Sequence, residues 1–103
     1  MANEAAKVAR LCTEASDTKI LDLSNCKLKN IPMAIYMMTN SFKDDIIKVN
    51  LSNNNLKKIP DKIFSHFHQA GEIVVGPGNE FSEDYKTELI NCWETERMSI
   101  IFE

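Results

Sequence analysis

The residues best suited to metal or proton chemistry are two histidines, His66 and His68, which are separated by one residue and followed by Glu72. A zinc site needs three or four converging ligands. Side chains two residues apart on a helix point in different directions. The sequence therefore favours surface histidines over a metal site, and we expect no metal and no other cofactor.

A thiol nucleophile is the second chemical candidate. Cys92 would need a nearby histidine and a lowered pKa to act as one, and its place in an apolar helical pattern instead predicts an inert, partly buried thiol. The Gly76-Pro77-Gly78 run is similar to part of a phosphate-binding loop, but Phe81 stands where the G-x-G-x-x-G pattern needs its last glycine. We expect no catalytic residues.

The elements that position these residues come from an internal repeat. Residues 21–36 and 49–64 match at an offset of 28 residues. Their common pattern is L-x-L-x-x-N/C-x-L, in which a short strand leads into a turn and a return segment. The matched pairs are Leu23/Leu51, Cys26/Asn54, Leu28/Leu56, Ile31/Ile59, Pro32/Pro60 and Ile35/Ile63.

Polar side chains in the turn after each strand have a predicted structural role. The bent backbone leaves amide and carbonyl groups that cost free energy if they are buried without partners. Asn54 suits this position because its side chain both donates and accepts, and can bond to its own turn and to the neighbouring one. Cys26 fills the equivalent place as a small buried thiol. We therefore predict Cys26, Asn54 and Asn79 as structural turn residues.

A third unit follows, with a weaker pattern. Aligning Asn79 with Asn54 sets a spacing of 25 residues. That alignment puts Gly76 at a core leucine position and Pro77 on the outward face, and both residue types weaken a strand. We expect a degenerate terminal repeat.

Helices are predicted at both ends of the chain. Val8, Leu11 and Ala15 have helical spacing, Asn3 is the predicted N-cap, and this helix would cover the first repeat.

The second helix is predicted around Tyr85, Leu89 and Trp93, folding back over the third unit with Trp93 at least partly buried. The apolar run at residues 100–102 is open to three interpretations: a last strand, a plug or a sticky end.

Two further groups of residues have a structural and a functional interpretation. Met37 and Met38 lie in the return segment after Pro32 and are interpreted as core filler rather than as an adaptable binding surface. Five lysines recur after the strands, and we interpret them as solvated loop residues, with a basic ridge for acidic partners as the alternative. They are Lys27, Lys29, Lys57, Lys58 and Lys62.

On these residues the chain resembles the leucine-rich-repeat family, and in particular its small intracellular members. The resemblance implies an α/β fold: a short solenoid with parallel strands, helical or irregular returns, an N-terminal capping helix and a C-terminal helix. It also implies that no catalytic residues are present. We expect one domain, 1–103, made of a capping helix (1–16), repeat 1 (17–45), repeat 2 (46–70), degenerate repeat 3 (71–82) and a C-terminal helix and tail (83–103).

Composition narrows the function classes. The chain has 103 residues, a formal net charge of −3, 44% hydrophobic and 26% charged residues, which is ordinary for a globular domain. The acidic balance argues against a nucleic-acid partner, and no apolar run approaches the length of a membrane span. Three widely spaced cysteines favour a reducing compartment, so we expect a cytoplasmic protein.

The leading hypothesis is a non-enzymatic protein–protein interaction module whose partner the sequence does not identify. The alternative is a structural or truncated repeat fragment that completes a larger repeat assembly, and a third possibility is a metal- or thiol-dependent enzyme. We expect a monomer or a weak homodimer through the C-terminal end. The candidate partner-binding strand face consists of Ile20, Asp22, Ser24, Lys48, Asn50, Ser52, Ile73 and Val75.

Overall fold

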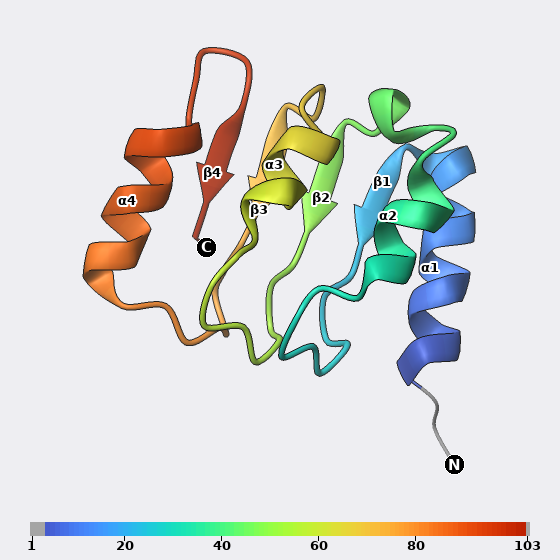
Figure 1. Cartoon of the computed structure of the whole chain (residues 1–103), viewed down its shortest axis with the longest axis horizontal. Coiled ribbons are helices and arrows are strands. Elements are labelled where there is room, and N and C mark those ends of the chain that lie inside the picture. The colour runs from blue at the N-terminus through green and yellow to red at the C-terminus, as the bar shows by residue number, and fades with distance from the viewer. Residues whose placement is uncertain (1–3, 103) are drawn as a thin grey trace.

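The computed structural model describes residues 4–102, in which four short parallel strands form one sheet in the order β1-β2-β3-β4 (Figure 1). The strands are β1 (Ile20–Asp22), β2 (Lys48–Asn50), β3 (Glu72–Val74) and β4 (Ser99–Ile101). The helices are α1 (Glu4–Thr18), α2 (Met33–Thr39), α3 (Asp61–His66) and α4 (Glu83–Trp93), with a short 3-10 helix, η1 (Lys43–Asp45), before β2. The predicted α/β solenoid with parallel strands is confirmed.

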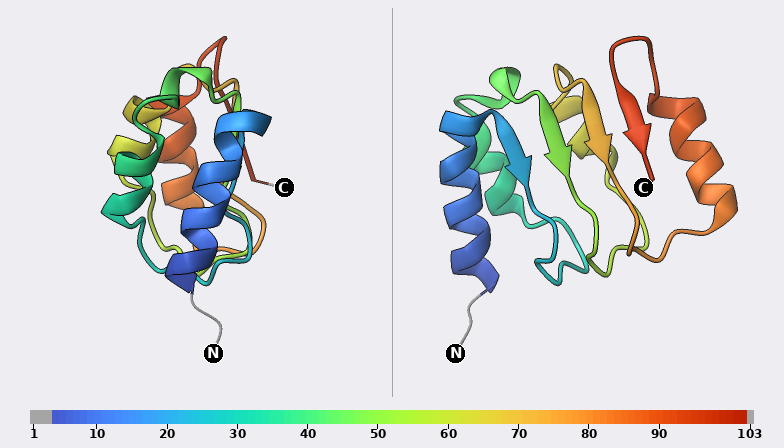
Figure 2. Two further views of the ribbon diagram at one scale, coloured as in Figure 1. Left: turned by 90° about the vertical axis from the view of Figure 1, so that its right-hand side faces the viewer. Right: turned by 180° about the vertical axis from the view of Figure 1, so that it is seen from behind.

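Each unit passes from a strand through a turn to a return helix on one side of the sheet. Figure 2 shows α2 and α3 side by side in a layer behind the strands, with α1 beside β1 at one end. The core lies between the sheet and these helices. Its fully buried members include Leu21, Leu23, Ile35, Val49, Leu51, Leu56, Ile63, Phe64 and Phe67.

Helix α1 covers the open core of the first unit. Val8, Cys12 and Ala15, which recur every three or four residues, are buried in the common core. The helix ends where Lys19 takes a left-handed conformation (φ 66°) and donates its amide to the Ala15 carbonyl at 2.8 Å. The predicted capping helix is confirmed, while its predicted N-cap, Asn3, lies outside the described residues.

The first two units are in the register that the sequence repeat predicts. Leu21 lies opposite Val49 and Asp22 lies opposite Asn50, so the strands keep the 28-residue offset of the repeat. Because side chains alternate along a strand, both leucine and valine point into the core.

The third strand is shifted by one residue from the register that Asn79 predicts. Val49 lies opposite Ile73, which is an offset of 24 residues and not 25. The turn between β3 and Asn79 therefore contains one residue more than the turn before Asn54. The glycine–proline run absorbs this residue: Gly78 adopts φ +92°, and the Pro77 carbonyl accepts the Asn53 amide at 2.9 Å.

Two residues assigned to the outward face by the sequence alignment point into the core instead. Ile73 and Val75 are both 0% exposed, because a shift of one residue moves every side chain of a strand to the other face. The outward positions of β3 belong to Glu72, which is exposed, and to Val74, which is largely covered. The prediction that Ile73 and Val75 line a partner-binding face is wrong.

The return helices begin directly after a proline. Pro32 precedes α2 and Pro60 precedes α3, where a residue without an amide proton leaves no hydrogen bond unmade. The core side of α2 is filled by Ile35, Tyr36 and Thr39. The neighbouring methionines, Met37 and Met38, are 74% and 37% exposed, so their interpretation as core filler is wrong.

Helix α4 packs onto the second unit as well as the third. The Trp93 ring stacks on Phe64, with centroids 5.0 Å apart and planes at 13°. The Tyr85 hydroxyl accepts the Ile59 amide at 2.6 Å and donates to the Ile59 carbonyl at 3.0 Å. Leu89 is buried and Trp93 is partly buried, which confirms the predicted C-terminal helix and the partial burial of Trp93.

The apolar tail forms the last strand of the sheet. Ile100 lies opposite Ile73, and the Ile101 carbonyl accepts the Val75 amide at 2.7 Å. The Ile100 amide donates instead to the Glu94 carboxylate at 3.1 Å. Of the three interpretations left open by the sequence, the structure selects a strand.

Candidate interaction surfaces

The outward face of the sheet carries two columns of side chains. The column nearest the start of the strands mixes apolar, charged and polar groups, and Ile20 is 40% exposed within it. It consists of Ile20, Lys48, Glu72 and Ser99. The second column consists of Asp22, Asn50, Val74 and Ile101.

The second column is partly occupied by its own hydrogen bonds. The Asp22 Oδ1 atom accepts the Ser24 amide at 3.1 Å and the Ser24 hydroxyl at 2.6 Å. The Asn50 Oδ1 atom accepts the equivalent groups of Ser52 at 3.0 and 2.7 Å. Ser52 is only 7% exposed and Ser24 is half-buried, so the assignment of Ser52 to a contact surface is wrong: its hydroxyl is turned back to close the strand end.

A hollow of about 320 Å³ adjoins this face where α1 meets β1. Its lining combines apolar side chains with two carboxylates, so it suits an apolar or basic side chain of a partner. It is lined by Leu11, Glu14, Thr18, Ile20 and Asp22.

Asn54 joins the turns of the first two units. Its Oδ1 atom accepts the amides of Cys26 and Leu28 at 2.9 and 3.1 Å. Lys27, between those residues, has φ 57°, which turns both amides toward one acceptor. The Asn54 Nδ2 atom donates to the carbonyls of Leu23, Leu51 and Ser52 at 3.0, 3.0 and 3.2 Å.

Asn79 occupies the same place between the second and third units. Its Oδ1 atom accepts the Leu56 amide at 3.0 Å, and its Nδ2 atom donates to the carbonyls of Leu51 and Val75, both at 2.8 Å. Cys26, in the first unit, is fully buried, with its thiol 3.5 Å from the Ser24 carbonyl. The three turn residues therefore lie in equivalent places, and the two asparagines bond to backbone groups of successive turns.

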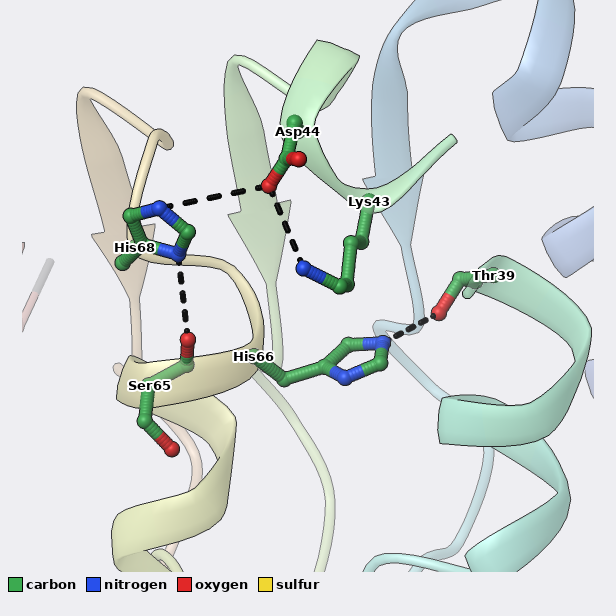
Figure 3. Close-up of polar contacts among 6 residues, drawn as sticks. All are labelled: Thr39, Lys43, Asp44, Ser65, His66 and His68. Atoms are coloured by element: carbon green, nitrogen blue, oxygen red, sulfur yellow. Dashed lines mark hydrogen bonds and ion pairs between the residues drawn. The ribbon is translucent and has the colours of Figure 1, made fainter. Parts of the chain in front are cut away.

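The two histidines point in different directions, as Figure 3 shows. His66 Nε2 lies 3.0 Å from Thr39 Oγ1 on α2. His68 lies on the other side of the loop, with Nδ1 3.2 Å from the Ser65 carbonyl and Nε2 4.0 Å from Asp44 Oδ1. Within residues 4–102, no three histidine, cysteine, aspartate or glutamate side chains are placed to hold a metal ion.

Burial lowers the pKa of His66, and the nearby ammonium groups of Lys43 and Lys62 lower it further, against a weaker opposite effect of Asp44. The two histidine rings bond to different groups, Thr39 and Ser65, so they do not converge on a common ligand. Glu72 is on the outward face of β3, whereas the histidines bond to Thr39 and Ser65.

None of the three cysteines forms a disulfide within residues 4–102: Cys12 and Cys26 are buried, and Cys92 is exposed rather than partly buried as predicted. Burial raises the pKa of the Cys12 thiol to about 11, with a smaller contribution from nearby Cys26, so that thiol is protonated and unreactive at neutral pH. Cys92 lines a hollow of about 130 Å³ whose described lining contains no histidine. This hollow therefore lacks the histidine that the thiol-nucleophile hypothesis requires.

Three of the five repeated lysines gather at the turn edge of the sheet. Lys29, Lys57 and Lys58 line a hollow of about 540 Å³ together with Asn30, Asn55 and Glu80. Lys62 lies elsewhere, on α3, with its Nζ atom 4.8 Å from the centre of the Tyr36 ring. These four lysines therefore do not form the single basic ridge that was the alternative interpretation: three lie at the turn edge and Lys62 lies on α3.

One surface lies where the sequence favoured core packing: the exposed side of α2, formed by Met37 and Met38 together with Met33, which the sequence did not single out. The signal that reveals it is a position-by-position comparison of the two return helices. The equivalent residues of α3 are polar.

Comparison with known proteins agrees with the fold. The Leucine Rich Repeat family pattern matches residues 17–38 and 45–67. These ranges contain the first two strands, their cysteine or asparagine turns, α2 except for its last residue, and all of α3. The chain is a leucine-rich-repeat protein.

Among named proteins, the chain is similar to "Leucine-rich repeat-containing protein 20" of Mus musculus, with 36% identity over 75 residues. The protein of the same name from Homo sapiens is 35% identical over 75 residues. Each match covers 71% of this chain and 41% of the relative, so the matched part of the chain spans about two fifths of the length of these relatives. No solved structure matches it significantly.

The comparison adds no catalytic residue. In the part of the chain that the structure describes, no helix is long and apolar enough to cross a membrane.

Proposed function

We propose that this protein is a non-enzymatic protein-interaction module that binds its partner through the outward strand face. The observation that carries the proposal is the first outward column, Ile20, Lys48, Glu72 and Ser99. These side chains stand on a rigid sheet and contribute little to the core, and the geometry of the turns does not depend on them.

The charges of this column are available to a partner. Lys48 and Glu72 are adjacent in register, but neither forms an ion pair within residues 4–102. Ile20 beside them supplies an exposed apolar group that also lines the hollow at α1. An apolar centre with charges around it is the arrangement that gives an interface both affinity and specificity.

The hollow at α1 extends a face that is otherwise narrow. Four strands about 4.8 Å apart are narrow, whereas a standard interface buries about 800 Å² on each partner. The rim of α1, with Leu11, Glu14 and Thr18, supplies additional contact area. We therefore place the centre of the interface at Ile20.

The test is affinity capture with charge-reversed strand variants. Lys48→Glu combined with Glu72→Lys should remove a partner that the wild-type chain retains, with an unchanged circular dichroism spectrum. Lys58→Glu combined with Glu80→Lys, at the turn edge, is the matched control and should leave capture intact. Loss of capture in the control alone would contradict the proposal.

Asp22 and Asn50 are unsuitable for this test. Their side chains hold the Ser24 and Ser52 amides, so substitution would disturb the strand ends as well as the surface.

The alternative is a repeat fragment that completes a larger repeat assembly. Its support is β4, which ends the sheet, together with the greater length of the two relatives. Such an assembly would pair another strand with β4, yet the Ile100 amide is already bonded to Glu94. Sedimentation at increasing concentration separates the two: a monomer favours the interaction module, and association that depends on β4 favours the fragment.

The same proposal assigns the module to the cytoplasm. None of the three cysteines forms a disulfide in the described residues, and Cys92 is exposed, which suits a reducing compartment. Cell fractionation of the tagged protein tests the assignment, and recovery from the secreted fraction would contradict it.

A further inference from the structure

The exposed sides of α2 and α3 differ in a way that the fold does not require. The two helices occupy equivalent positions, 28 residues apart, in successive units. On α2 the four outward positions hold Met33, Ala34, Met37 and Met38, and all four are exposed. On α3 the same positions hold Asp61, Lys62, Ser65 and His66. Because α3 folds with polar residues there, the apolar residues of α2 are not needed to build the unit.

The apolar side of α2 continues into a hollow at its contact with α1. This hollow has a volume of about 210 Å³, which is enough for an aliphatic or aromatic side chain. It is lined by Ala5, Val8 and Ala9 of α1, by Ala34 and Met38 of α2, and by Leu28 and Pro32 between β1 and α2. Small residues on both helices let a third helix approach closely, and methionines adapt their shape to the partner.

The opposite flank of α2 is cationic. A second hollow, of about 400 Å³, lies between α2 and α3 and is lined by Met33, Met37, Lys62 and His66 among others, with no carboxylate in its lining. The Lys62 Nζ atom is 3.9 Å from Met33 Sδ, and it forms no ion pair within the described residues. An acidic side chain of a partner would be attracted to this flank.

We propose that α2, with the α1–α2 hollow, is a second docking surface, and that it binds an amphipathic helix of a partner protein with an apolar face and an acidic flank. The inference rests on the proposed function as an interaction module but uses the helical side of the solenoid. One large apolar side chain of the partner enters the α1–α2 hollow, others cover Met37, and a carboxylate lies against Lys62.

A helix fits this surface better than an extended strand. The exposed apolar positions of α2 lie at i, i+1, i+4 and i+5, so they form a stripe along one side of the helix. A helix laid along the seam with α1 presents its own apolar side chains at the same repeat, as in helix-in-groove recognition. No unpaired strand edge is present at α1 or α2, because both are helices.

The test uses a synthetic amphipathic peptide of about 15 residues, with leucines on one helical face and glutamates beside them. Binding to the full chain is measured by fluorescence anisotropy, and the contact is located from the methyl NMR signals of the methionines. The double variant Met37→Ser and Met38→His gives α2 the residues that α3 carries. It should bind the peptide at least tenfold more weakly while keeping the wild-type melting temperature within a few degrees.

Matched controls separate the apolar and the charge contributions. Ser65→Ala, on the exposed side of α3, should leave the affinity unchanged. A peptide with lysines in place of the glutamates should bind the wild-type chain more weakly, and Lys62→Ala should reduce this difference.

Three results would overturn the inference. The first is no binding of the peptide at roughly millimolar concentration. The second is a double variant that binds the peptide as tightly as the wild-type chain, and the third is a set of NMR signal shifts confined to the strand face. Concentration-dependent self-association that Met37→Ser abolishes would also overturn it, because a second copy would then be the occupant. The proposed function fails separately, since it depends on Lys48 and Glu72, which are on the opposite side of the sheet.

Discussion

Thr39 and His66 form a hydrogen bond between successive return helices whose direction is fixed by a third group. The Thr39 hydroxyl donates its single proton to the Ile35 carbonyl at 2.7 Å. Its oxygen must therefore accept from His66 Nε2 at 3.0 Å. The neutral ring of His66 is consequently protonated on Nε2, and it packs nearly perpendicular to the Tyr36 ring, with centroids 5.1 Å apart and planes at 77°.

The lowered pKa of His66 makes stability depend on pH. The folded state favours the neutral ring through burial and through Lys43 and Lys62, although Asp44 opposes them. Below the ordinary pKa of 6.5, the unfolded chain therefore binds more protons than the folded chain. We predict that the free energy of unfolding falls as the pH drops through 6.5, measured by urea denaturation between pH 7.5 and 5.5. The slope should decrease in His66→Gln and persist in His68→Gln.

Tyr36→Phe should stabilise the protein. The Tyr36 hydroxyl is buried and has no hydrogen-bond partner in the described residues, and the equivalent residue of the second unit is Phe64. Removing a buried, unpaired hydroxyl should increase the free energy of unfolding by about 1 kcal/mol. Chemical denaturation measures the change. A clear loss of stability would show that the hydroxyl has a partner, such as a buried water.

Asn54→Ala should be among the most destabilising substitutions at the turns. Asn54 is only 4% exposed, and its removal leaves two backbone amides and up to three carbonyls without their partner. We therefore expect the free energy of unfolding to fall by about 3 kcal/mol. Asn79→Ala should cost less, because Asn79 is only part-buried and bonds to three backbone groups. Cys26→Ala should cost least of the three. Equal, small losses in guanidinium denaturation would contradict the role of the asparagines.

Lys27→Asn should be mildly stabilising. Lys27 has φ 57°, a conformation that crowds the Cβ atom of most residues but that asparagine adopts more readily. We expect a gain of roughly 0.5–1 kcal/mol, measured as a shift of the urea midpoint. Lys27→Val at the same exposed position is the matched control and should destabilise, since a β-branched side chain fits this conformation poorly.

The regular part of the fold was predictable because one offset relates every feature of the first two units. Strand, turn and return helix keep the same spacing, so aligning Cys26 with Asn54 also aligns Leu21 with Val49. In the third unit the turn and the strand follow different offsets. Asn79 keeps its place in the turn, while Ile73 and Val75 keep theirs in the core, and the extra residue lies between them. A hydrophobic pattern of only three strand residues is too short to reveal such a shift.

The interaction surfaces were less predictable, because exposure depends on how many sides of a helix are covered. Helical spacing predicts that Met37 and Met38 belong to the return helix, but it does not show that the solenoid covers only one side of that helix. The engagement of Asp22 with Ser24 has a visible signal, since Asn50 and Ser52 repeat the same spacing in the second unit. The division of the lysines between the turn edge and α3 follows only from the three-dimensional arrangement.

The asparagine turns also give the chain a direction of assembly. Each asparagine belongs to the later unit and bonds to backbone groups of the earlier one, as Asn54 does with the Cys26 amide 28 residues before it. During synthesis the first turn thus emerges from the ribosome without its acceptor, and it can close only after Asn54 has followed. In the same way, the Leu56 amide of the second turn has its acceptor only after Asn79 has been made. The N-terminal unit is made first, but it cannot become fully hydrogen-bonded before the unit behind it has been made.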